Sequence, residues 1–259
     1  TRGLVRPGEA LTPGFVTRGA GGKNLLIRAV GPTLGLFGVT GALADPRLEV
    51  IPLGGTVATW SNDDWVVGGS AQAAFASAGA FALPAGGSKD AALLANVSSP
   101  SSGYTVRIAG PTVAAAGVAL AEVYDLDAPS SPVRLINVST LGYSGAGADA
   151  LTPGFVIGGV APKPLLIRAV GPTLAGFGVT GILADPKLEV FRQGTEAPLA
   201  TNDNWSAPIS PSTATAAQLT AAFSSVGAFA LTIGSRDSAV LATLAPGTYT
   251  VRAKPASGV

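Results

Sequence analysis

The chain has 259 residues, a formal net charge of +1 and a composition that is 47% hydrophobic and 12% charged, which predicts a folded rather than a disordered chain. It contains no His and no Cys, which excludes disulfides, Cys/His zinc sites, thiol nucleophiles and His general bases. No run of Lys or Arg is present, so nothing favours a nucleic-acid surface.

Short segments rich in Val, Leu and Ile, each bounded by Gly, Pro, Asn or Ser, predict strands joined by tight turns. Two Ala-rich stretches are expected as short helices, with Phe75 and Phe223 at matching places, and one helical turn is expected after Pro32. In the first half of the chain the predicted strands are 14–18, 24–30, 47–52, 56–60, 91–97, 104–109 and 118–124, and a further predicted strand at 133–139 leads into the second half. The predicted helices are 70–78 and 214–225, and the helical turn is 34–37.

The sequence repeats itself with a period of about 140 residues. The segment Ala-Leu-Thr-Pro-Gly-Phe-Val occurs at 10–16 and at 150–156, and Leu-Leu-Ile-Arg-Ala-Val-Gly-Pro-Thr-Leu occurs unchanged at 25–34 and 165–174. Solenoid and propeller units are much shorter, so a period of this length is that of a whole domain. The strand spacing then predicts an all-β chain of two tandem β-sandwich, jelly-roll-like domains with short Ala-rich helices in their loops.

The expected domains are residues 1–129 and residues 130–259, linked by the Pro- and Ser-rich stretch 127–132. The strand pattern at 117–126 has no counterpart in the second repeat, which is therefore expected to lack its closing strand. An unpaired sheet edge readily accepts a strand from another chain. Two interpretations remain open: the chain is a fragment of a longer array, or a neighbouring subunit supplies the strand.

Asn and Asp residues gather at matching places in the two repeats, next to predicted strand ends. Calcium takes six to eight oxygen ligands, which a loop of adjacent Asn and Asp side chains and a distant carboxylate can supply. The alternative is ordinary turn chemistry, in which Asn and Asp bond their own backbone. The candidate calcium ligands are Asp45, Asn62, Asp63, Asp64 and Asp90 in the first repeat and Asp185, Asn202, Asp203, Asn204 and Asp237 in the second.

Several short motifs carry a resemblance to a known family. Ala-Thr-Trp-Ser-Asn-Asp-Asp at 58–64, Ser-Lys-Asp at 88–90 and Ala-Pro-Gly-Thr-Tyr-Thr-Val-Arg at 245–252 are similar to motifs of the bacterial pre-peptidase C-terminal domain. That resemblance implies a β-sandwich appended to secreted enzymes, some members of which bind calcium or matrix polymers. The whole repeat also resembles tandem β-sandwich domains of large secreted bacterial surface proteins, which implies location more than activity.

The block 25–34 contains one charged residue, Arg28, whose counterpart is Arg168. The two arginines are either ligand-binding residues or members of a core strand, paired with a carboxylate such as Glu49 or Glu189. Because side chains alternate along a strand, Leu26 and Arg28 are expected on one face and Ile27 on the other. The tryptophans and Tyr143 are expected as core or rim aromatics rather than a sugar-binding face.

The expected function is a non-catalytic structural repeat of an extracellular surface fibre or stalk, assembling with other copies of itself through strand edges. The alternative is an adhesive or carbohydrate-binding accessory module of a secreted enzyme, with a surface polysaccharide or matrix polymer as its partner. Catalysis is not expected, because the adjacent Asp63 and Asp64 point to opposite faces of a strand. No apolar stretch reaches the ~20 residues of a membrane span, and the absence of Cys and Met fits a secreted, cell-surface location.

Overall fold

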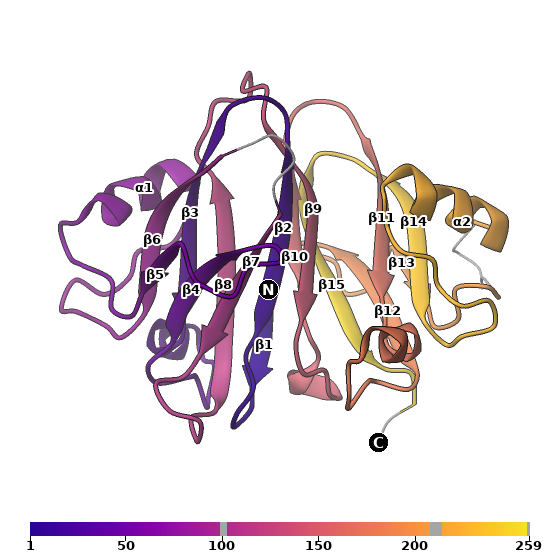
Figure 1. The fold of residues 1–259 in the computed structure, drawn as a ribbon, viewed down its shortest axis with the longest axis horizontal. Coiled ribbons are helices and arrows are strands. Elements are labelled where there is room, and N and C mark those ends of the chain that lie inside the picture. Colours follow the sequence, from indigo (N-terminus) through magenta and orange to yellow (C-terminus); the bar gives the residue numbers. More distant parts are fainter. Residues whose placement is uncertain (99–102, 208–213, 258–259) are drawn as a thin grey trace. The chain divides into compact units, whose positions relative to one another are not determined.

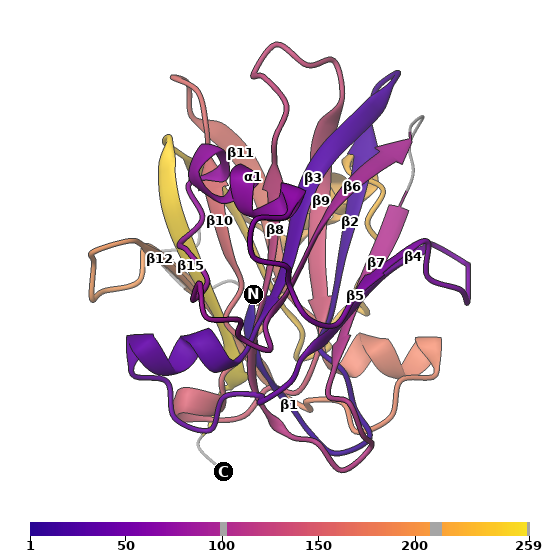
Figure 2. The ribbon, with the colours of Figure 1, turned by 90° about the vertical axis from the view of Figure 1, so that its left-hand side faces the viewer.

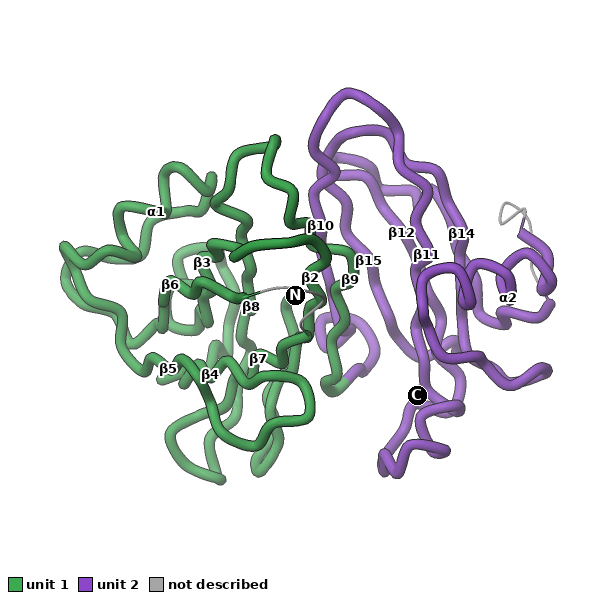
Figure 3. The backbone as a smooth tube through the Cα atoms, turned by 45° about the horizontal axis from the view of Figure 1, so that its top comes forward, with its two compact units in different colours: residues 1–143 green, residues 144–259 purple. Residues whose placement is uncertain are grey.

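The computed structural model describes residues 1–98, 103–207 and 214–257, and their regular structure is mostly antiparallel β-sheet with few helices (Figure 1). The all-β prediction is therefore confirmed. The chain divides into two compact units, Thr1–Tyr143 and Ser144–Val259, which Figure 3 distinguishes by colour. In the described part of the chain, no helix has the length and apolar character needed to cross a membrane.

Unit 1 is built from two antiparallel sheets, with strand orders β1-β8-β3-β6 and β5-β4-β7-β2-β9. β3 therefore lies inside its sheet, between β8 and β6 (Figure 2). The strands are β1 (Arg2–Val5), β2 (Thr12–Arg18), β3 (Gly22–Val30), β4 (Arg47–Pro52), β5 (Trp60–Asn62), β6 (Ala91–Ser98), β7 (Gly103–Ala109), β8 (Gly117–Asp125) and β9 (Arg134–Leu141). The helices are the 3-10 helix η1 (Pro32–Phe37) and α1 (Ser70–Ala78).

Unit 2 repeats part of this plan, with one sheet of order β10-β15-β12-β13 and a two-stranded sheet β11-β14. β11 corresponds to β3 and β14 to β6, so among the described residues of unit 2 no strand takes the place of β8. The strands are β10 (Gly154–Ile157), β11 (Lys163–Ala169), β12 (Pro186–Arg192), β13 (Ala200–Asn202), β14 (Ser238–Leu244) and β15 (Gly247–Pro255). The helices are the 3-10 helices η2 (Gly147–Asp149) and η3 (Pro172–Phe177) and the α-helix α2 (Ala216–Ser225).

The run of apolar residues in β3 is explained by cover on both faces of the strand. Leu26 and Val30 pack in a cluster with Trp65 and Phe75, the latter from α1. Leu25, on the opposite face, is 1% exposed. In unit 2, residues of β11 and β14 share one cluster with β12 and β15, while their other face packs against Trp205 and α2.

The sequence located most strands and both α-helices, including β4 and α1 with the bounds observed. The predicted strand 56–60 is wrong, because residues 53–59 form a turn and bends and regular pairing begins only at Trp60. β1 was not predicted at all. Its four residues pair with β8, which lies near the other end of the unit 1 sequence, so no local pattern reveals this pairing.

The boundary between the compact units falls after Tyr143 rather than after residue 129. The reason is β9, which the sequence assigns to the second repeat but which pairs with β2 in the first unit. Phe15 lies opposite Val138 in this ladder, and the register shifts between Val16 and Thr17.

Candidate functional site

The candidate ligand Asp90 is a buried carboxylate that holds the Gly-Pro-Thr turn after β3. It is 0% exposed and accepts the backbone N–H of Gly31 at 2.7 Å together with the hydroxyls of Thr33 and Ser88. A Cβ at position 31 would lie 2.0 Å from the carbonyl oxygen of Leu43, so only Gly fits this turn. The bonds satisfy both carboxylate oxygens, as a buried charge requires.

Asp237 performs the same task in unit 2. It accepts the N–H of Gly171 at 2.8 Å, the hydroxyl of Thr173 and the hydroxyl of Ser235 at 2.6 Å. We call these two hydrogen-bonded groups the Asp braces. They explain why the Gly-Pro-Thr segment and the Ser-x-Asp motif occur together in both repeats.

The tryptophan after the Asn-Asp motif belongs to each brace. The backbone N–H of Trp65 donates to the carbonyl of Asp90 at 2.9 Å, and that of Trp205 to the carbonyl of Asp237 at 2.8 Å. The two indoles are 4% and 1% exposed and lie beside Phe75 and Phe223. These two tryptophans are therefore core aromatics, while Trp60 is half-buried.

Asn62 and Asn202 fasten one strand end to the neighbouring sheet. Oδ1 of Asn62 accepts the N–H of Ala92 at 2.9 Å, while its Nδ2 donates to the carbonyl of Asp64 at 3.0 Å. Asn202 makes the matching bonds to Ala239 at 3.0 Å and to the carbonyl of Asn204 at 3.2 Å. This is the turn chemistry that the sequence left open as one of two interpretations.

The other acidic candidates of unit 1 lie around a surface cation. Asp64 accepts from Lys89 at 2.8 Å, and this bond, together with the charges of Asp64, Asp45 and Asp63, raises the pKa of Lys89 above its usual range. Asp63 also lies 3.2 Å from Nε of Arg47. The structure thus brings Asp45, Asp63 and Asp64 to one region and leaves Asp90 apart in the core.

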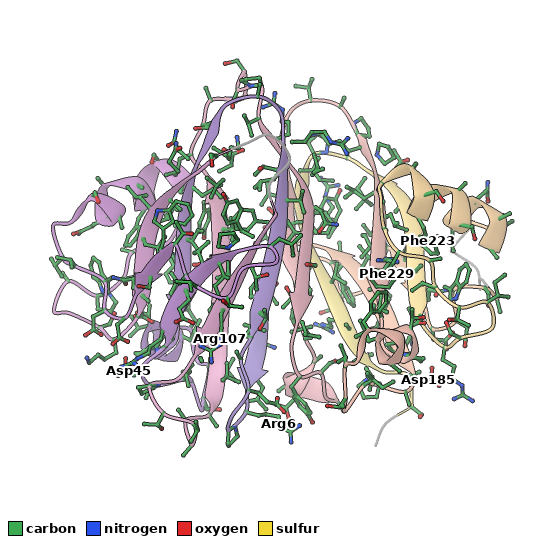
Figure 4. All side chains as sticks on the ribbon, viewed as in Figure 1. Arg6, Asp45, Arg107, Asp185, Phe223 and Phe229 are labelled. Atoms are coloured by element: carbon green, nitrogen blue, oxygen red, sulfur yellow. The ribbon has the colours of Figure 1, made fainter. Side chains whose placement is uncertain are left out.

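In unit 2, Asp185 pairs with Arg236 at 2.8 Å and Asp203 accepts from Asn204 at 3.3 Å. Asp45 and Asp185, both labelled in Figure 4, occupy equivalent places before β4 and β12. The Oδ1 atom of each is buried without a hydrogen-bond partner among the described residues. Within residues 1–98, 103–207 and 214–257, no group of three or more acidic residues is arranged to hold a metal ion. Calcium binding stays a prediction of the sequence.

Arg28 is a buried cation held by β8. Its Nε donates to Glu122 at 2.8 Å, its Nη1 donates to the carbonyl of Phe81 at 2.6 Å, and its guanidinium lies 4.3 Å from the centroid of the Phe81 ring. The Tyr124 hydroxyl donates to the other oxygen of Glu122 at 2.7 Å, and burial together with that carboxylate raises the pKa of Tyr124. A carboxylate partner was expected from the sequence, but it is Glu122 rather than Glu49.

Glu49 and Glu189 pair elsewhere. Glu49 accepts from Arg107 at 2.9 Å, and Glu189 lies 3.0 Å from the ammonium of Lys254. The signal for the true partner was available: Glu122 stands alone among apolar residues in the strand at 117–124, and a charge in such a place needs a buried counter-ion.

A second buried cation, Lys23, was missed at the sequence level. It is 0% exposed, and its ammonium lies 2.7 Å from a carboxylate oxygen of Asp125 and 3.2 Å from one of Asp127. Both acids follow Glu122 at the end of β8 and the start of the next turn. β8 therefore neutralises the two cations of β3.

The equivalent cations of unit 2 have a different environment. Arg168 donates to the carbonyl of Phe229 at 2.7 Å and lies over the rings of Phe223 and Phe229, which Figure 4 labels. No carboxylate among the described residues pairs with it, and its partial burial lowers its pKa. Lys163, the counterpart of Lys23, is exposed.

Comparison of the chain with protein-family models, with curated proteins and with solved structures found no match in any of the three. The resemblance to the pre-peptidase C-terminal domain stays a prediction. The geometry itself shows the two Asp braces, a set of surface ion pairs, and two strands, β3 and β11, that share a sequence but differ in their neighbours.

Proposed function

We propose that the chain is a non-catalytic structural repeat of an extracellular surface fibre or stalk, and that repeats join through the edges of their sheets. In this proposal each unit is one β-sandwich domain, and the two domains follow each other as tandem repeats. The candidate residues act in folding, because the Asp braces and the side chains of Asn62 and Asn202 form hydrogen bonds with other groups of the same chain.

One observation carries the proposal. β3 pairs with strands on both sides, whereas among the described residues β11, with the same core sequence, pairs only with β14. In the other sheet, β2 pairs with both β7 and β9, whereas within the part of the chain that the structure describes β10 pairs only with β15. A strand edge presents unpaired N–H and C=O groups, which a further strand can satisfy.

The side chains on these edges support the same view. Val156 on β10 is 73% exposed, while the equivalent Val16 on β2 is half-buried. An exposed apolar residue on an unpaired edge strand favours association with another strand, and natural edges that must stay single are usually blocked by charge.

Sedimentation velocity over a range of concentrations tests the proposal. We expect the purified chain to associate as its concentration rises, and Val156→Lys to weaken that association because a charge on an edge strand opposes pairing. Val160→Lys is the matched control, since Val160 is exposed but lies in the turn after β10. A chain that stays monomeric at every concentration contradicts assembly between copies.

A further inference from the structure

We propose that Lys23 and Asp127 form an intramolecular amide cross-link, with Asp125 transferring the protons. The bond joins the start of β3 to the turn after β8, and it gives this Cys-free chain a covalent tie of a kind that needs no disulfide. The inference does not depend on association between copies, because every group that it uses lies in unit 1.

The nucleophile is the amine of Lys23. This side chain is 0% exposed, and its Nζ lies 2.7 Å from Oδ2 of Asp125 and 3.2 Å from Oδ2 of Asp127. Nζ nevertheless forms no hydrogen bond of normal geometry with any described residue. An ordinary buried ion pair directs its N–H groups at the acceptors. Nζ therefore lies in contact with both carboxylates without the directed bonds of an ordinary ion pair.

Asp127 is the carboxyl group better placed to react with the amine. Its side chain is 12% exposed, whereas that of Asp125 is 38% exposed. Oδ1 of Asp127 accepts the backbone N–H of Asn24 at 3.4 Å and the side-chain Nδ2–H of Asn24 at 2.8 Å. Two N–H donors on one oxygen stabilise the negative charge that develops there when a nucleophile adds to the carboxyl carbon.

The amide of Asn24 is held in the orientation that this reaction requires. Its Oδ1 accepts a hydrogen bond from Nδ2 of Asn96 at 2.7 Å, so its own Nδ2 is directed at Asp127. The equivalent of Asn24 in unit 2 is Pro164, which has neither the side-chain amide nor the backbone N–H, and Lys163 is exposed. One cross-link in the chain is therefore expected.

The reaction is a condensation that balances from the ion pair itself. A bond forms between Nζ of Lys23 and Cγ of Asp127, and the bond between Cγ and Oδ2 of Asp127 breaks. Two of the three ammonium protons leave with Oδ2 as one water, and the third stays on the amide nitrogen. Asp125 carries these protons from Nζ, which lies 2.7 Å from its Oδ2. The two charges cancel, and no oxidant or further reactant is needed.

Burial favours the amide over the free ion pair. A buried ion pair carries a desolvation cost, and a neutral amide removes both charges. Water, which would hydrolyse the amide, has little access to Nζ because Lys23 is 0% exposed. Holding the two groups together also replaces a bimolecular reaction by an intramolecular one, for which effective concentrations reach about 10⁵–10⁸ M.

Intact-mass spectrometry of the folded full chain tests the proposal. We expect a mass lower than that of the sequence by one water, and a tryptic digest in which peptides 19–28 and 108–134 are joined through Lys23 and Asp127. A folded chain with the full sequence mass overturns the proposal. A loss of water without linked peptides, which indicates a succinimide, overturns it as well, and a link to Asp125 overturns the assignment of Asp127 as the acceptor.

Variants separate the roles of the residues. Lys23→Arg and Asp127→Ala should each abolish the loss of water. Asp125→Asn should slow cross-linking about 100-fold or more, because the proton carrier is removed. Asn24→Ala should also slow it, because one of the two donors to Oδ1 is lost. Asn24 is exposed, so this variant keeps the test valid if substitution of the buried Lys23 unfolds unit 1.

The rates are read as masses of chain made by cell-free synthesis and quenched at intervals. Wild-type rates in both Asp125→Asn and Asn24→Ala overturn the mechanism. Lys89→Arg is the matched control, because Nζ of Lys89 lies at a similar distance, 2.8 Å, from Asp64, but these side chains are 57% and 47% exposed. This variant should still lose one water, and retention of its full sequence mass would overturn the assignment of Lys23.

Discussion

At the scale of single residues, the same side chain has different consequences in the two units. Asp90 and Asp237 accept the same set of hydrogen bonds in the two buried braces. Arg28 and Arg168 differ because, among the residues that the structure describes, only Arg28 meets a carboxylate. A buried charge without a partner is destabilising, while a fully bonded one fixes the loops around it. The role of each arginine therefore depends on the residues that surround it and not on the repeated block in which it lies.

Asp90→Asn should destabilise unit 1 by about 1–3 kcal/mol, because one carboxylate oxygen becomes an amide that faces donors already committed to it. The hydroxyls of Thr33 and Ser88 and the N–H of Gly31 all point at this side chain. Urea denaturation, read out by hydrogen exchange of unit 1 peptides, measures the loss.

Asp63→Asn is the control for this experiment. Asp63 is an exposed carboxylate paired with an equally exposed Arg47, so its replacement should change the free energy of unfolding by less than about 0.5 kcal/mol. Equal effects of the two substitutions would show that the brace contributes nothing beyond a surface charge.

At the scale of elements, β3 and β11 allow a comparison of the same sequence in two environments within one molecule. They share the block Leu-Leu-Ile-Arg-Ala-Val, yet in the described parts of the chain β3 has a strand on each side and β11 on one side only. In an antiparallel sheet, the N–H groups of successive residues point alternately to the two neighbouring strands. β11 therefore has donors directed at an unpaired edge that β3 does not have.

Hydrogen exchange should reveal this difference directly. We expect residues 166–170 to exchange faster than residues 26–30, by about tenfold or more at the donors of the free edge. Intrinsic exchange rates match because the sequences are identical, so the comparison needs no correction. Peptides extended to position 24 or 164, and to Gly35 or Ala175, separate the two blocks by mass. Equal protection of both blocks would contradict the free edge.

The helices differ in how they begin. α2 starts with a capping box, in which the side chains of Thr215 and Gln218 bond each other's backbone N–H groups, whereas α1 starts at Gly69 without a side-chain cap. Both nevertheless cover the same face of their sheets through Phe223 and Phe75. Packing of these rings, rather than capping, accounts for the shared position of the helices.

At the scale of the whole molecule, the two units differ in how deeply their shared strand is buried, so a single two-state transition is not expected. Unit 2 should unfold at lower urea than unit 1, because part of its repeated core strand is half-exposed and buries less apolar surface. Trp205 reports on unit 2, and Trp60 and Trp65 report on unit 1, in fluorescence of single-tryptophan variants. One coincident transition for all three would contradict this order.

The sequence by itself determined the β class, the duplication and most elements. Strand patterns, turn residues and the repeated blocks are local signals, and they identified β4 and α1 with the observed bounds. It also offered, as one of two interpretations, that Arg28 belongs to a core strand with a carboxylate partner. These features depend on alternation and composition within a short stretch of chain, which the sequence displays directly.

Only the tertiary structure decided which distant residues meet. It showed that Glu122 pairs with Arg28, that Asp90 and Asp237 accept buried hydrogen bonds, and that β9 pairs with β2 in the first unit. It also showed that two identical strands have different neighbours. Such contacts join positions far apart in the chain, so no local pattern encodes them, and burial is a property of the neighbours rather than of the strand itself.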